Sequence, residues 1–291
     1  MKVTLDYGTE GLELDLDGMN ARIFRPTYPA PLEDEAAGFF EAARKPIGSV
    51  PLREKINSGD KVAIAIPDIT RPLPSGRLLA WLFEEIDHIS PENIVIINGT
   101  GTHRANTDEE LLNMLGEDIC STYKILNNDA QDSFSHVEVG KSLDGKPVKL
   151  NRAYVEADKR VVLGFIEPHF WAGFSGGYKG VFPAIADLES IMHYHRATVV
   201  ADKRSTWGLL DGNPTLQQVQ HNGALLAPDF LINVTLNRAK AITGCFCGEV
   251  MQAHLAGCDF AKKTAMSAVD HTFPIVLTSN SGYPLDQNLY Q

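Results

Sequence analysis

Three short apolar runs constrain the fold of this chain more than any other feature. They lie at residues 61–66 (KVAIAI), 93–98 (NIVIIN) and 160–164 (RVVLG), and each is continuous rather than alternating. A continuous run of this length is typical of a strand that is buried on both faces. A helical pattern over residues 75–88 separates the first two runs. This order predicts an α/β fold with a mainly parallel, twisted sheet and helices on both faces.

Weaker patterns add elements around these runs. Residues 1–27 alternate apolar and polar side chains, which predicts an N-terminal β-hairpin that rests on the main sheet. Thr107 and Glu110 have the spacing of a capping box, so a helix is expected from there to Leu115. The other expected elements are helices at 32–44, 213–221 and 249–267, and strands at 123–126, 136–139, 147–150, 229–236, 239–245 and 273–278.

The composition limits the classes of partner and the compartment. Of the 291 residues 44% are hydrophobic, and the net charge of −11 disfavours a nucleic-acid or acidic-membrane partner, because both need a cationic face. The start has no export signal, and no apolar stretch has the length of a bilayer crossing. Four cysteines in so long a chain suit the reducing cytoplasm, and their spacing disfavours a zinc site. A folded, cytoplasmic protein is therefore expected.

Polar residues follow each of the three apolar runs. Asp68 and Arg71 come after the first, His103 and Arg104 after the second, and His169 after the third. Because the carboxyl ends of parallel strands meet at one edge, the ligand crevice is expected there. Asp68 and Arg71 form a loop salt bridge in one interpretation. In the other, the arginine holds a substrate carboxylate and the aspartate orients it.

Residues 165–198 carry the densest group of chemically useful side chains. A glycine-rich turn at 173–177 can bring backbone N–H groups close to an anion, which favours phosphate. The turn is not a Walker A loop, because Tyr178 separates Gly177 from Lys179. Lys179 can act as a point charge for phosphate or as an amine that bonds covalently to a carbonyl-like group of a cofactor, and the spacing leaves both open.

Three of the nine histidines are candidates for function. His103 and His169 lie in loops flanked by glycine or proline, and His195 follows soon after Lys179. Together they could bind zinc, but none belongs to a His-Glu-x-x-His signature. The turn at 99–104 does not match a dinucleotide fingerprint, because its sixth residue is arginine. The histidines expected to be structural are His88, His136, His193, His221, His254 and His271.

Five motifs occur in order along nearly the whole chain. They are Asp68-Ile-Thr-Arg71-Pro, Gly101-Thr-His103-Arg, Glu167-Pro-His169-x4-Phe-Ser-Gly-Gly-Tyr-Lys179, His195, and Gly282-Tyr-Pro-Leu-Asp-Gln-Asn-Leu-Tyr-Gln291. Together they resemble the lactate racemase family, whose members use a nickel-pincer nucleotide cofactor. The resemblance covers the larger, N-terminal domain of that family and the beginning of its second domain.

The resemblance implies a role for each matching residue. Lys179 would form the covalent link to the pyridinium ring of the cofactor, a mononucleotide whose thioamide and thiocarboxylate groups hold nickel, and His195 would be the protein ligand to the metal. His103 and His169 would be the acid/base pair on opposite faces of the substrate. The residues expected to bind the substrate are Asp68, Arg71, Tyr290 and Gln291. The turns expected on physical grounds to suit the nucleotide's phosphate contain Thr100, Gly101, Thr102, Ser175, Gly176 and Gly177.

The implied activity is racemisation or epimerisation of a lactate-like 2-hydroxy acid. The α-hydrogen of such an acid is very weakly acidic, so its removal as hydride avoids a carbanion. In the family's scheme one histidine takes the hydroxyl proton while hydride passes to the pincer, and return of hydride to the other face of the 2-keto acid inverts the configuration. Histidine suits this task because its pKa lies near neutral pH.

Two other functions stay open on the residues alone. A metal-dependent hydrolase would use His103, His169 and His195, and it would bind zinc without a nucleotide. A non-catalytic binding domain would hold a phosphorylated ligand at Ser175–Gly177, and Lys179→Ala would then weaken binding only moderately.

The resemblance also divides the chain. Residues 1–280 would form the cofactor-binding catalytic domain, and residues 281–291 would be a hinge into a second domain that this chain lacks. The family has a substrate-binding lysine just beyond the glutamine that corresponds to Gln291, so the chain is expected not to turn over substrate alone. Its expected partners are the small-molecule substrate and the proteins that make the cofactor.

Overall fold

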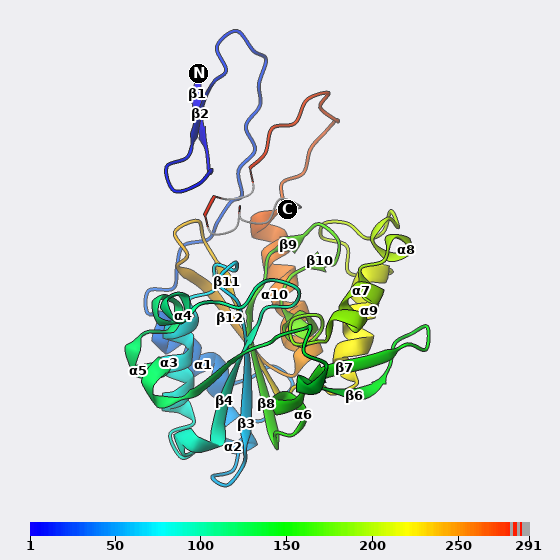
Figure 1. Ribbon diagram of the computed structural model, residues 1–291. Coiled ribbons are helices and arrows are strands. Elements are labelled where there is room, and N and C mark those ends of the chain that lie inside the picture. Colours follow the sequence, from blue (N-terminus) through cyan, green and yellow to red (C-terminus); the bar gives the residue numbers. More distant parts are fainter. Residues whose placement is uncertain (280–281, 284–285, 287–291) are drawn as a thin grey trace.

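The computed structural model describes residues 1–279, 282–283 and 286, and its centre is one large sheet (Figure 1). Six strands have the order β12-β11-β8-β3-β4-β5; five are parallel, and β12 is antiparallel to β11. The strands are β3 (Val62–Pro67), β4 (Ile94–Gly99), β5 (Lys124–Asn127), β8 (Lys159–Phe165), β11 (Phe230–Leu236) and β12 (Ile242–Gly248). The three apolar runs are thus the neighbouring interior strands β8, β3 and β4, which confirms the predicted α/β class.

Helices cover both faces of the sheet (Figure 1). On one face, Ile64 and Ile66 pack under α1 (Glu35–Arg44), α2 (Leu52–Lys55), α3 (Ser75–Glu85), α4 (Asp108–Leu115) and α5 (Glu117–Thr122). On the other, Ala63 and Ala65 pack under α6 (Arg152–Val155), α7 (Leu188–Tyr194), α9 (Pro214–Ala224) and α10 (Val250–Ala265). Successive side chains of a strand point to opposite faces, so the apolar run must be continuous to fill both cores.

Capping side chains fix where several helices begin. Thr107 and Glu110 form the expected capping box of α4, because each side chain accepts a hydrogen bond from the other residue's backbone N–H. Asp34 and Asn213 cap α1 and α9 through their side-chain oxygens. The helices α4 and α9 therefore start where the sequence pattern places them, whereas α1 begins at Glu35, three residues after the predicted start.

Two predicted β elements lie outside the main sheet. β1 (Lys2–Leu5) and β2 (Leu12–Asp15) form the expected N-terminal hairpin, but it stands away from the sheet at the top of Figure 1, so the prediction that it rests there is wrong. Most of its side chains are exposed, which leaves it little apolar surface to pack with. β6 (His136–Lys141) and β7 (Pro147–Asn151) form a separate two-stranded sheet.

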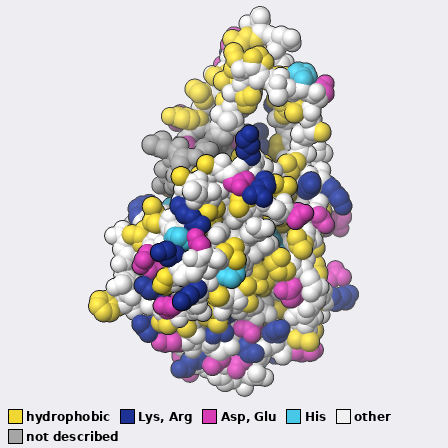
Figure 2. Space-filling view, turned by 90° about the vertical axis from the view of Figure 1, so that its right-hand side faces the viewer, with side chains coloured by type: hydrophobic (Ala, Val, Ile, Leu, Met, Phe, Trp, Pro, Cys, Tyr) yellow, Lys and Arg dark blue, Asp and Glu magenta, His cyan; other side chains and the backbone are white. Residues whose placement is uncertain are grey.

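The predicted strand at 273–278 is also wrong. The structure has no regular element there, and Ile275 is 77% exposed. The segment belongs to the projecting part of the molecule, where Phe273 packs edge-on against Phe24 of the N-terminal segment. Figure 2 shows hydrophobic side chains on the surface of this projection. An apolar run forms a strand only where a neighbouring strand offers unpaired backbone groups, and Phe24 lies in a segment without strand structure.

The remaining elements are short. They are η1 (Pro91–Asn93), η2 (Ser133–Ser135), β9 (Pro168–His169), β10 (Gly173–Phe174), η3 (Gly177–Gly180) and α8 (Ala197–Val200). In the part of the chain that the structure describes, no helix has the length and apolar character needed to cross a membrane.

The same substitution at two isoleucines tests this fold. Ile64→Ala removes a fully buried side chain and should lower the free energy of unfolding by about 2–5 kcal/mol. Ile275→Ala changes an exposed side chain and should stay within about 0.5 kcal/mol of wild type. Urea unfolding followed by circular dichroism measures both, and an equal loss at the two sites would mean that residues 273–278 belong to the core.

Candidate active site

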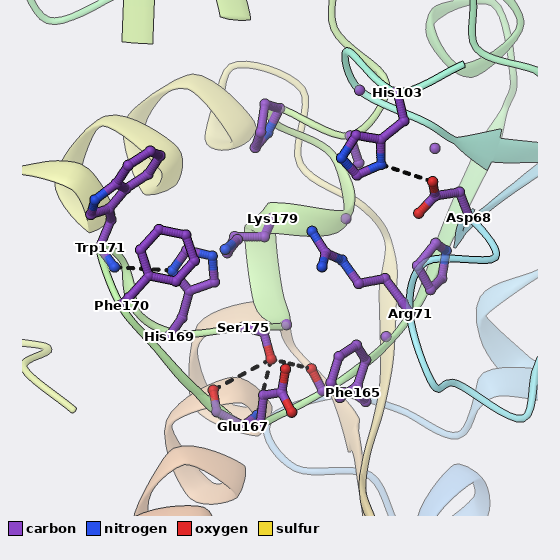
Figure 3. Close-up of a pocket in the computed structure, with 18 of the residues that line it drawn as sticks. Asp68, Arg71, His103, Phe165, Glu167, His169, Phe170, Trp171, Ser175 and Lys179 are labelled. Carbon is purple, nitrogen blue, oxygen red and sulfur yellow. Dashed lines mark hydrogen bonds and ion pairs between the residues drawn. The ribbon is translucent and has the colours of Figure 1, made fainter. Parts of the chain in front are cut away.

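A cavity of about 840 Å³ opens at the carboxyl ends of β3, β4 and β8, where the sequence predicts the ligand crevice. The predicted site residues that line it are Asp68, Arg71, Thr100, Gly101, Thr102, His103, His169, Ser175, Gly176, Lys179 and His195. In Figure 3, Lys179 and Arg71 lie between His103 and His169. Gly177 is instead buried behind the cavity wall, and Tyr290 and Gln291 fall outside the described residues.

Asp68 and Thr70 hold His103 in a defined orientation (Figure 3). β3 ends at Pro67, and the buried carboxylate of Asp68 then accepts a hydrogen bond from Nδ1 of His103 at 2.9 Å. Oγ1 of Thr70 donates to the other oxygen of Asp68 at 2.8 Å. The side chain of Asp68 therefore pairs with His103, a partner that sequence spacing did not suggest.

His169 is held by backbone groups instead of a carboxylate. Its Nδ1 accepts hydrogen bonds from the N–H groups of Trp171 and Ala172, both at 3.2 Å. Its ring stacks on Phe170, with 4.5 Å between the ring centres. Burial in the cavity wall lowers the pKa of His169 well below its ordinary value of 6.5, and the nearby cationic side chains, chiefly that of Lys179, lower it further. His169 is therefore neutral at neutral pH.

The turn that carries Lys179 lies directly on β11 and α10. Gly176 and Gly177 have φ angles of +82° and +56°, which favour glycine. A Cβ on Gly176 would come within 2.5 Å of Oδ1 of Asn233, and one on Gly177 within 2.7 Å of the His254 ring. Asn233 accepts from the N–H of Gly177 at 2.8 Å, and Nε2 of His254 donates to the carbonyl of Ser175 at 2.9 Å. Two buried polar side chains thus fix the turn.

These two supporting residues were missed at the sequence level. Asn233 is completely buried in the apolar strand β11, and a lone carboxamide in such a run was the signal for it. His254 was expected to be structural, and its contact with the turn agrees with that expectation. Neither residue belongs to a local motif, because their partners lie more than fifty positions away in the chain.

The environment of Lys179 favours its neutral amine. Burial lowers the pKa of Lys179 to about 7, the positive charge of Arg71 lowers it in the same direction, and the carboxylate of Glu167 opposes both. An amine with this pKa is neutral in a large fraction of molecules at neutral pH, whereas an ordinary lysine is almost fully protonated. Lys179 can therefore act as a nucleophile.

Glu167 is a further residue of the cavity whose role the motif alone did not reveal. It lies at the lower end of the site in Figure 3, next to Ser175, whose hydroxyl accepts from the backbone N–H of Glu167 at 3.0 Å. Surrounding protein raises the pKa of its carboxyl to about 7, while the charges of Arg71 and Lys179 lower it. Although the side chain is accessible from the cavity, its carboxylate is coupled electrostatically to both cations.

His195 lies at the C-terminal end of α7 and lines the same cavity. Burial lowers the pKa of His195 to about 4, and the charge of Lys179 adds to this effect. The rings of Tyr194 and Trp171 flank it at 4.5 and 5.7 Å between centres. A neutral imidazole in an aromatic setting is a suitable metal ligand. His193 bonds instead to Asp144, as expected for a structural residue.

The two turns predicted to hold phosphate use several of their N–H groups internally. The N–H of Gly101 donates to Ala184 at 2.9 Å, and the N–H of Thr100 donates to Asn98 at 3.1 Å. Thr102 is exposed on the cavity wall. Phosphate binding at these turns stays a prediction. Side-chain hydroxyl groups would have to supply part of the hydrogen bonds to the phosphate.

The histidines do not form a zinc site of the usual kind. Within the described residues, no three histidine, cysteine, aspartate or glutamate side chains are grouped closely enough to hold a metal ion. His103, His169 and His195 line one cavity but are spread around it. A hydrolase that uses all three as zinc ligands therefore gains no support from this geometry.

Comparison with known proteins points to one family. Residues 7–208 match the family model of the lactate racemase N-terminal domain. The chain is 35% identical to lactate racemase of Lactiplantibacillus plantarum over 96% of this chain and 68% of that protein. It is also 35% identical to lactate racemase of Thermoanaerobacterium thermosaccharolyticum, over 99% of this chain and 68% of that protein.

Solved structures show the same architecture. The lactate racemase apoprotein of T. thermosaccharolyticum matches with a TM-score of 0.85 and 31% identity, over 100% of this chain and 69% of that one. A protein from Thermotoga maritima shares the fold, with a TM-score of 0.69 and 21% identity over 85% of this chain and 62% of that one. The fold is that of an α/β protein, and the relatives place the chain among enzymes of the isomerase class. The chain belongs to the lactate racemase family.

The reactivity of Lys179 should reveal its lowered pKa. Acetylation by acetic anhydride should follow an apparent pKa of about 7 at Lys179. Arg71→Gln removes a neighbouring positive charge and should raise this value, while Glu167→Gln should lower it. Peptide mass spectrometry as a function of pH measures the rates, with the exposed Lys203 as an internal reference. Identical profiles in all three proteins would contradict the electrostatic coupling.

Proposed function

We propose that the protein interconverts the two enantiomers of a lactate-like 2-hydroxy acid, with a nickel-pincer nucleotide as its cofactor. The observation that carries this proposal is the placement of Lys179, His195 and the His103–Asp68 pair around one cavity in a member of the lactate racemase family. The two relatives described above are themselves named lactate racemase.

The cavity suits the proposed cofactor. Its volume of about 840 Å³ far exceeds the needs of a small hydroxy acid and lies in the range that cofactor-sized ligands use. Lys179, with its lowered pKa, would hold the pyridinium ring covalently, and the neutral His195 would hold the nickel. The residues proposed for the phosphate remain those of the two turns at 100–102 and 175–177.

The chain's own residues would bind the substrate and move its proton. When bound, the cofactor supplies an acceptor for hydride. Arg71 would hold the substrate carboxylate, because its planar guanidinium matches that group. His103 would take the hydroxyl proton, and Asp68 would stabilise the imidazolium that forms. His169, on the other side of Lys179 and Arg71 in Figure 3, would serve the opposite enantiomer.

The aromatic wall would protect this chemistry. Phe170, Trp171 and Trp207 line the cavity on the side of His169, where they would limit the access of water. Exclusion of water strengthens the charge interactions at Arg71 and prevents loss of a reactive intermediate. The larger 2-hydroxy acids remain possible substrates under this proposal, because the catalytic groups are the same for all of them.

The organisation of the whole protein follows from the same proposal. Residues 1–280 would form the catalytic domain, and residues 281–291, most of which lie outside the described part, would lead into a second domain that completes the substrate site. The protein would receive its cofactor from dedicated biosynthetic proteins and would work in the cytoplasm.

Intact-protein mass spectrometry with metal analysis tests the cofactor. After co-expression with the cofactor's biosynthetic enzymes, wild type should carry a covalent nucleotide and nickel, and Lys179→Ala should lose the covalent mass. His195→Ala should keep the covalent nucleotide but lose most of the nickel. Lys203→Ala, which changes an exposed lysine, is the matched control and should be loaded like wild type. Zinc without a nucleotide would point to the hydrolase instead.

Asp68→Asn tests the acid/base role of His103. The asparagine keeps the size of the side chain, but its N–H can donate to Nδ1 and so favour the wrong tautomer of the imidazole. The rate of lactate racemisation should fall by roughly 10²–10⁴-fold, the usual contribution of a general base. Chiral chromatography of the product measures this loss. A rate near that of wild type would exclude His103 as the base.

A further inference from the structure

Nδ1 faces different chemical groups in the two histidines of the proposed pair. In His103 it lies 2.9 Å from a carboxylate oxygen of Asp68. In His169 it lies 3.2 Å from the backbone N–H groups of both Trp171 and Ala172. An ionised carboxylate can only accept a hydrogen bond, and a backbone N–H can only donate one. Nδ1 must therefore carry a hydrogen in His103 and a lone pair in His169.

We propose that the resting site contains one proton acceptor and one hydrogen-bond donor, an assignment that rests on the racemase function proposed above. The neutral ring of His103 carries its lone pair on Nε2 and acts as the base. The neutral ring of His169 carries a hydrogen on Nε2 and acts as a hydrogen-bond donor. The backbone N–H groups of Trp171 and Ala172 are the positioning groups that create this difference.

The turn that presents these two N–H groups is held firmly in place. β9 and β10 pair at His169 and Gly173, which closes the turn between them. Gly173 has a φ of +76°, and a Cβ there would come within 2.2 Å of the carbonyl oxygen of Leu209. The side chain of Asn213 donates to the carbonyl of Trp171 at 2.8 Å. The tautomer of His169 is thus fixed by packed backbone and not by an adjustable side chain.

The two enantiomers then meet different groups. When the substrate hydroxyl faces His103, Nε2 of His103 would take the proton as the O–H bond breaks, and the electron pair left on oxygen would form the carbonyl. The bound cofactor would supply the acceptor for the α-hydrogen as hydride. When the hydroxyl faces His169, its oxygen accepts a hydrogen bond from Nε2–H. His169 can act as a base only after its hydrogen has moved to Nδ1, which breaks both backbone hydrogen bonds.

The kinetic consequence follows from the equilibrium constant. Racemisation has an equilibrium constant of 1, so kcat/KM must be the same for both enantiomers. The change of tautomer in His169 lies on the path in both directions, so it adds the same cost to the reaction of either enantiomer. The loss of two hydrogen bonds corresponds to a factor of about ten or more in this shared cost.

Nuclear magnetic resonance of the cofactor-free protein tests the tautomers directly. In a sample with ¹⁵N-labelled histidine, long-range ¹H–¹⁵N correlations should show His169 with its hydrogen on Nε2 and neutral His103 with its hydrogen on Nδ1. His169→Gln and His103→Gln assign the two signals. In Asp68→Asn, His103 should change to the Nε2–H form while His169 stays the same. A hydrogen on Nδ1 of His169, or the same tautomer in both rings, would overturn the proposal.

Steady-state kinetics of the cofactor-loaded, full-length protein give the second readout. Each enantiomer is used as substrate, and kcat and KM are compared. If the predicted tautomers are found but the loaded protein does not interconvert lactate enantiomers, the proposed function fails while the tautomers stand. The two measurements therefore separate the inference from the function on which it rests.

Discussion

The burial of β8, β3 and β4 on both faces is the constraint on which the rest of this structure depends. Helical crossovers between these strands cover both faces of the sheet and make the strands run parallel, because each crossover returns the chain to the same edge. Their carboxyl ends therefore meet, and the loops that follow them surround one cavity. Side chains as distant in sequence as Asp68 and His195 line that cavity together.

A second layer of contacts gives the cavity its chemistry. Buried polar groups behind the wall orient the groups that face inward: Asp68 orients His103, and Asn233 and His254 fix the turn that carries Lys179. Cations then share a poorly solvated space, so the pKa of Lys179 falls and the histidine rings near it are neutral. Burial and neighbouring charge thus turn an ordinary lysine into a neutral nucleophile and ordinary histidines into neutral bases.

The predictable part of the protein was the part governed by local or periodic rules. The continuous apolar runs predicted the central strands, and Thr107 and Glu110 predicted the start of α4, because burial on two faces and helix capping leave short-range patterns. The run at 273–278 has an equally good strand pattern but no adjacent strand edge with which to pair. The N-terminal hairpin lacks a face of buried apolar side chains that could pack on the sheet. Pairing partners are not encoded locally, so these two predictions were wrong.

The sequence by itself determined the α/β class, the crevice at the strand ends and the set of candidate residues, because strand burial and polar strand exits are properties of short segments. Only the tertiary structure decided how those residues are held. The partner of His103 comes from another loop, the partners of the Lys179 turn come from β11 and α10, and the partners of His169 are backbone groups. Protonation depends on such neighbours and on burial, which exist only once distant segments have packed together.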